Sequence, residues 1–306
     1  MIRYVLKRLM MLVPVLFGVT LVSFSLLQIV PGDPAVLLAG EDANPEFIEA
    51  VRKEYGFDQP LHVQYLRFVA RAVQGDFGIS IRNREPVTRL LLQRFSFTVQ
   101  LSFLSILIAA AIGLVAGVVS ATRQYSLFDH ASMVGALLGI SMPIFWLGLL
   151  LMLVFSVHLR WLPAGGSGEL RHLILPAIAL GAASAAVIAR MTRASMLEVI
   201  RQDYIRTARA NGLRETVVIY KHALKNAMIP VITVFGLEFG YMLGGAVLTE
   251  TVFSLPGVGR LMVEGIFQRD YAVVQGAMLL VATTFVLVNL LTDIAYALFD
   301  PKIRYE

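Results

Sequence analysis

The sequence predicts an all-α integral membrane protein with six transmembrane helices. Of its 306 residues, 57% are hydrophobic and only 15% are charged, whereas soluble domains average about 25% charged residues. The apolar residues form long runs without Lys, Arg, Asp or Glu, at 9–32, 95–122, 130–159, 172–189 and 271–292. A bilayer core requires roughly 20 apolar residues per helix, so each run is long enough, or nearly so, to cross a membrane.

A sixth span is expected from Asn226 to Thr249, provided that Glu238 is tolerated at its middle. The first run follows three basic residues, as a secretory signal does, but its length and the turn residues after it favour a retained helix. The six expected spans cover about 9–30, 95–121, 131–157, 173–189, 226–249 and 271–292.

The charges between the spans predict the orientation of the chain. Residues 190–226 carry eight basic and three acidic residues, and the N-terminus is basic as well. Cytoplasmic loops of membrane proteins are enriched in Lys and Arg, so we expect residues 190–226 and both termini in the cytoplasm. Residues 31–94 are then outside, because long loops are translocated largely regardless of their charge.

This orientation divides the chain into four parts. Residues 1–30 form the cytoplasmic N-terminus and the first span, and residues 31–94 form an extracytoplasmic segment of two or three short helices. Residues 95–293 form a core with five spans, and residues 294–306 form a cytoplasmic tail. Within the outer segment, Asn44 is expected to cap a helix that begins at Pro45.

Several kinds of chemistry are excluded or unsupported by the sequence. Without cysteine there is no disulfide, thiol nucleophile or thiolate metal site. The chain has no phosphate-binding loop, and its five histidines have no metal-ligand spacing, so we expect no bound cofactor and no metal. The net charge of +5 reflects orientation in the membrane and does not indicate nucleic acid binding. A membrane hydrolase stays open as an alternative, but no feature favours it.

Glu238 is the most unusual residue of the predicted spans. An ionised carboxylate at the centre of a membrane helix costs about 3 kcal/mol on insertion scales, so such a residue usually faces a partner or a hydrated path. Glu238 therefore belongs either to a translocation path or to a hydrogen-bonded structural pair. If it is an ion or proton site, the chain could instead be a secondary transporter or channel.

Residues 190–226 contain a helical pattern with a basic surface. Leu197, Ile200, Tyr204 and Ala208 recur at helical spacing, and glycine at position 212 is expected to end a helix. The segment is either a surface helix attracted to anionic lipid or an element that docks on a cytoplasmic partner.

The same segment resembles the cytoplasmic loop of the permease subunits of bacterial ABC importers. In that superfamily the loop contains a Glu-Ala-Ala triplet, a glycine four positions after the triplet, and a later leucine; here Arg206-Thr207-Ala208, Gly212 and Leu224 take these places. Arg206 and Thr207 depart from the superfamily pattern. The run from Asp203 to Gly212 is nevertheless similar to the form found in dipeptide, oligopeptide, nickel and glutathione permeases, and so are Pro31–Ala35, Gly75–Ser80 and Thr249–Arg260.

This resemblance implies the type I ABC importer permease fold and a role in ATP-driven import of small peptides across the bacterial inner membrane. It also implies a homologous second permease, two cytoplasmic ATPase subunits that use ATP, an extracytoplasmic binding protein and surrounding lipid as partners. The residues implied in coupling to the ATPases are Asp203, Tyr204, Arg206, Thr207, Ala208, Arg209, Gly212, Leu213 and Leu224.

Overall fold

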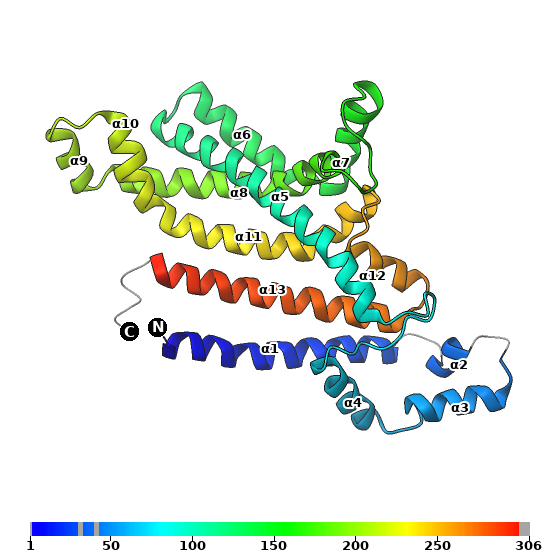
Figure 1. Cartoon of the computed structure of the whole chain (residues 1–306). Coiled ribbons are helices and arrows are strands. Elements are labelled where there is room, and N and C mark those ends of the chain that lie inside the picture. Colours follow the sequence, from blue (N-terminus) through cyan, green and yellow to red (C-terminus); the bar gives the residue numbers. More distant parts are fainter. Residues whose placement is uncertain (1, 30–32, 40–42, 300–306) are drawn as a thin grey trace.

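The computed structural model describes residues 2–29, 33–39 and 43–299, and the regular elements within these ranges are helices. The all-α prediction is therefore confirmed. The long helices run side by side: α1 (Ile2–Ile29), α5 (Val87–Thr122), α8 (Arg171–Ile200), α11 (Leu224–Val252) and α13 (Tyr271–Phe299) (Figure 1).

Four stretches of helix are long and apolar enough to cross a membrane: Val87–Thr122, Arg171–Ile200, Glu215–Gly244 and Tyr271–Ile294. A fifth crossing is possible if α6 (Leu127–Ser141) and the helix after it, α7 (Ile144–Leu151) with the π-helical η1 (Met152–His158), act as one span. In α1 the apolar part is the shorter segment Leu9–Ser25. The count of six spans thus stays a prediction.

The expected third span, 131–157, is not one straight helix. Its two halves meet at an angle of 106°. The break lies at Met142 and Pro143, where Met142 has the extended backbone (φ −80°, ψ 126°) that proline imposes on the residue before it. Proline predicts this break locally, but the size of the bend is set by packing against other helices.

Four helices extend well beyond the boundaries expected from charge. α1 begins at Ile2, α5 begins at Val87, α8 continues to Ile200 and α13 reaches Phe299. For α8 the physical reason is visible, because Arg193 is paired with Asp129 and its charge is neutralised within the helix bundle. Residues 190–200 thus belong to a long helix, and the non-spanning part of the loop begins after them.

The outer segment contains three short helices, α2 (Pro34–Ala39), α3 (Pro45–Tyr55) and α4 (Leu61–Val73). The predicted cap is confirmed, since the Asn44 side chain accepts a hydrogen bond of 2.7 Å from the backbone N–H of Phe47. These helices lie at the end of the molecule that also holds α12 (Val258–Phe267) (Figure 1).

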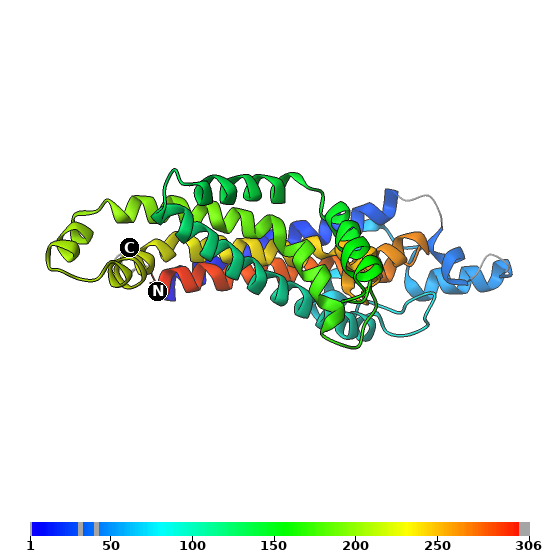
Figure 2. The ribbon, with the colours of Figure 1, turned by 90° about the horizontal axis from the view of Figure 1, so that it is seen from above.

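The two ends of the bundle are different. α9 (Asp203–Ala210), α10 (Glu215–Val217), the start of α1 and the end of α13 lie at one end, and α2, α3 and α12 lie at the other (Figures 1 and 2). The first and last described helices thus begin and end, respectively, at the end of the bundle that holds residues 203–217, and the orientation of the termini in the membrane stays a prediction.

The most extensive helix contact joins α5 to α8. A Cβ added at Gly113 would lie 2.8 Å from the carbonyl oxygen of Ala185, and one at Gly117 would lie 2.7 Å from that of Ala189. This small-xxx-small spacing lets two helices approach closely in lipid, where packing drives association. The small residues Ala185 and Ala189 of α8 thus let α8 pack closely against α5.

Candidate functional site

The predicted coupling residues come together in a compact unit at the end of the molecule that holds α9. On α9, Ile205 and Ala208 are buried, and they pack against Val118 of α5, Met196 of α8 and residues of the π-helical η2 (Val218–Ala223). The predicted residue Leu224 begins α11 and packs against this cluster from its edge. α9 is therefore packed mainly on η2 and is joined through this cluster to the ends of α5 and α8, so it is not a free loop.

The end of α9 is a local structure centred on Gly212, as predicted. Gly212 has φ +74°, its N–H donates to the carbonyl of Arg209 at 2.9 Å, and the N–H of Leu213 donates to the carbonyl of Ala208 at 3.4 Å. Together these bonds form a Schellman motif, in which a left-handed residue ends the helix and satisfies its last carbonyl groups. Glycine suits this position because it lacks the Cβ that makes a positive φ unfavourable.

Several predicted residues remain exposed around this helix. Tyr204 is 42% exposed, and its hydroxyl accepts a hydrogen bond of 2.8 Å from the side chain of Asn226. Asp203, Arg206, Thr207 and Leu213 are exposed too, and Arg206 makes only a long ion pair of 3.5 Å with Asp203. The resulting surface offers polar, basic and aromatic groups to a partner.

Arg209 differs from Arg206 because it is fixed within the chain. Its Nη2 and Nε atoms lie 2.7 and 3.1 Å from the two carboxylate oxygens of Glu215, at the start of α10. The hydrogen bond to Glu215 raises the pKa of Arg209 above its already high ordinary value. This pair closes the turn after α9, and sequence reasoning missed it because the partners lie six positions apart, across a turn without a regular spacing rule.

Glu238 lies in the middle of α11 and is half-buried. One of its carboxylate oxygens accepts a hydrogen bond from the hydroxyl of Ser184 on α8. Tyr241, which follows one turn later on α11, is exposed on the surface of this chain. The prediction left two roles open for Glu238, and the structure supplies a hydrogen-bonding partner while leaving part of the side chain accessible.

A second carboxylate, Glu250, escaped the sequence analysis. It is 1% exposed at the end of α11, and it accepts hydrogen bonds from the hydroxyl of Thr98 (2.6 Å) and the backbone N–H of Arg260 (3.0 Å). Thr98 in turn accepts a bond of 3.0 Å from the N–H of Val258. The carboxylate thus binds the N-terminus of α12, where free N–H groups and the helix dipole favour an anion, and ties α12 to α5 and α11.

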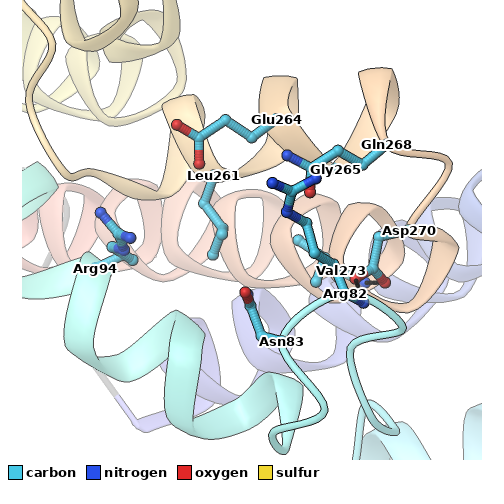
Figure 3. Close-up of a pocket in the computed structure, with 9 residues that line it drawn as sticks. All are labelled: Arg82, Asn83, Arg94, Leu261, Glu264, Gly265, Gln268, Asp270 and Val273. Atoms are coloured by element: carbon cyan, nitrogen blue, oxygen red, sulfur yellow. Dashed lines mark hydrogen bonds between the residues drawn. The ribbon is translucent and has the colours of Figure 1, made fainter.

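A small pocket lies near the opposite end of the bundle from α9, between the loop at 82–83, α5, α12 and the start of α13 (Figure 3). Its two arginines are balanced by two carboxylates, so the wall has no net charge. One of these carboxylates, Asp270, is already hydrogen-bonded to Ser80 at 2.6 Å. The pocket is lined by Arg82, Asn83, Arg94, Leu261, Glu264, Gly265, Gln268, Asp270 and Val273. Among the described residues, no group of three or more His, Asp or Glu side chains could hold a metal ion.

Comparison with known proteins identifies the family. Residues 113–305 match the binding-protein-dependent transport system inner membrane component, and residues 1–102 match the N-terminal part of the same kind of membrane component. The chain belongs to this family of ABC importer permeases. The resemblance noted in residues 203–224 is therefore confirmed.

Relatives in the family match the whole chain. It is 48% identical over 306 residues to the glutathione transport system permease protein GsiC of Escherichia coli K12, covering 100% of both chains. It is 46% identical over 333 residues to the dipeptide transport system permease protein DppB of Alkalihalophilus pseudofirmus, again covering 100% of both.

Solved structures support the fold alone. The inward-facing MetNI methionine ABC transporter aligns with a TM-score of 0.59 at 20% identity, covering 69% of this chain and 96% of that one. An amino acid ABC transporter solved with histidines aligns with a TM-score of 0.51 at 17% identity, covering 72% of this chain and 95% of that one. The type I ABC importer permease fold is thus confirmed.

Proposed function

We propose that this permease subunit carries small peptides, of the dipeptide or glutathione type, into the cell in an ATP-driven importer. The observation that carries the proposal is the full-length identity of 48% and 46% to permeases named for glutathione and dipeptide transport. The substrate class is taken from those names, since selection also depends on a separate binding protein.

The proposed importer needs further components: a binding protein, ATPase subunits and a second permease. The family name implies an extracytoplasmic binding protein. Two ATPase subunits supply hydrolysis and dock on α9, and a homologous permease supplies the other half of the path. Alternating access then arises as the two permeases rock about a central site. This chain performs no hydrolysis itself.

The orientation in the inner membrane follows from charge and from the two ends of the bundle. Residues 190–226, with eight basic and three acidic residues, face the cytoplasm with their α9 and α10 segment, together with both termini. α2, α3, α4 and α12 face outward. Glu238 then lies within the membrane, close to the path. Its partial exposure and the nearby Tyr241 support that placement.

The test is purification of the tagged chain from its native membrane, followed by reconstitution into vesicles. We expect two ATPases and a second permease to co-purify, and the vesicles to accumulate a labelled dipeptide or glutathione only with ATP and binding protein. Uptake by this chain alone, driven by an ion gradient and without ATP, would instead establish a secondary transporter.

A further inference from the structure

The feature that the proposed function does not yet use is an ion pair between α6 and α8, formed by the buried Asp129 and the half-buried Arg193. Asp129, in the first turn of α6, is 3% exposed. Its Oδ1 lies 2.8 Å from Nε of Arg193, and its Oδ2 lies 2.8 Å from Nη2 of the same residue. Two parallel hydrogen bonds between a guanidinium and a carboxylate fix the mutual orientation of the two groups.

The carboxylate of Asp129 is also bonded to α5 and to the turn that follows it. Ser120, near the end of α5, donates its hydroxyl hydrogen to Oδ1. The backbone N–H of Tyr125, in the turn, donates to Oδ2 at 2.9 Å. Arg193 donates from Nε to the hydroxyl oxygen of Ser120 as well, at 3.0 Å. One polar cluster thus joins α5, α6 and α8.

This polar cluster lies close to the base of α9. Arg193 lies about two turns before the end of α8 at Ile200, and α9 begins at Asp203. Val118 and Ala121, which flank Ser120 on α5, belong to the apolar cluster that holds Ile205 and Ala208 of α9. A displacement of α9 would therefore reach the ends of α5 and α8 through η2 and this apolar cluster.

We propose that the Asp129–Arg193 ion pair clamps α6 to α8, so that α5, α6, α8 and α9 move as one body during the transport cycle. Both residues are positioning residues for coupling, and the inference rests on the proposed function. A buried ion pair is weak support for stability, because apolar replacements of similar volume are often as stable. The pair instead prevents α6 from sliding along α8. Sliding of α5 along α8 is already resisted by the close glycine contacts between those two helices.

The absence of native cysteine allows a direct test of this rigid body. A Cβ added at Gly139 of α6 would lie 3.7 Å from the Cβ of Ala186 on α8, within the range of about 3.5–4.5 Å found in disulfides. The variant G139C/A186C is introduced into the complete importer in vesicles and oxidised, and free thiols on this chain are counted with a maleimide reagent.

If α6 and α8 move together, oxidised and reduced forms should take up labelled dipeptide or glutathione at rates within about twofold of each other, close to the error of comparing variants. Arrest of uptake on oxidation, with recovery on reduction, would show that the two helices must move apart and would overturn the proposal. This arm keeps the native ion pair and does not depend on the folding of a charge variant.

The second arm removes the charge with D129N. We expect uptake per ATP hydrolysed, counted per assembled complex, to fall by about fivefold or more, in the range of typical coupling energies. The amount of complex is measured beside it, because D129N leaves the charge of Arg193 without its partner and lowers stability as well. Oxidation of D129N/G139C/A186C should restore the ratio, which a purely structural defect would not allow. An unchanged ratio of uptake to ATP hydrolysis in D129N would contradict the proposal. A lowered ratio that the cross-link does not restore would contradict it as well.

Two controls separate the possible failures. E264Q removes a comparable charge pair of 2.8 Å with Arg260, but both residues lie on α12, so coupling should stay unchanged. An unmodified importer that shows no ATP-dependent uptake would count against the proposed function, whereas the clamp is judged only on an importer that transports.

Discussion

Replacing Gly212 tests the coupling assignment most directly. Gly212 ends α9 with φ +74°, and a Cβ added there would meet no atom of this chain within 4 Å. The effect of a side chain within this chain is therefore backbone strain and not a collision. Left-handed backbone costs a non-glycine residue roughly 1–2 kcal/mol, and strained positions of this kind about 1–3 kcal/mol.

That strain determines the size of the expected effect. A difference of 1–3 kcal/mol between two states corresponds to a change of about 5- to 150-fold in their ratio. In Gly212→Val, the ratio of α9 in its docking geometry to α9 displaced from it should fall by that factor. Gly212→Asn is the matched control, because asparagine tolerates the left-handed region far better than a β-branched residue.

The assay compares retained ATPase subunits and ATP-dependent uptake for both variants in the same membranes. We expect Gly212→Val to lose ATPases or to hydrolyse ATP without uptake, and Gly212→Asn to remain near the unmodified protein. Equal behaviour of the two variants would show that the left-handed turn is irrelevant. Full uptake with Gly212→Val would refute the assignment of α9 as the coupling element.

Three further predictions concern other parts of the chain. Glu250→Ala should lower the free energy of unfolding by about 2 kcal/mol or more, because it leaves the Thr98 hydroxyl and the backbone N–H of Arg260 without their acceptor, at about 1–3 kcal/mol each. Thermal unfolding in detergent measures this, and a loss no larger than that of Glu264→Ala would contradict it. Glu238→Gln should change the uptake rate of the importer while leaving its assembly intact, whereas reduced abundance with normal uptake per complex would make Glu238 structural. Single cysteines at Lys53 and Arg214 should react with an impermeant maleimide from opposite sides, and labelling of both in intact cells would overturn the topology.

The sequence alone determined the features that depend on neighbouring residues. Long uncharged runs predict membrane helices because insertion into the bilayer depends mainly on the length and hydrophobicity of the segment itself. The cap at Asn44 involves an atom only three residues away, and the turn at Gly212 closes within six residues. Local bonds of this kind can be predicted from spacing, and so could the family resemblance carried by residues 203–224.

Only the tertiary structure decided which polar groups meet inside the bundle. Asp129 and Arg193 are 64 residues apart in the chain, and Thr98 and Glu250 are 152 apart. A single buried charge looks unfavourable in a sequence, so counting charges ended the fourth span at Arg190, although α8 continues to Ile200. The charge of Arg193 is accepted there because Asp129 neutralises it, and that pairing exists only once α6 has packed against α8.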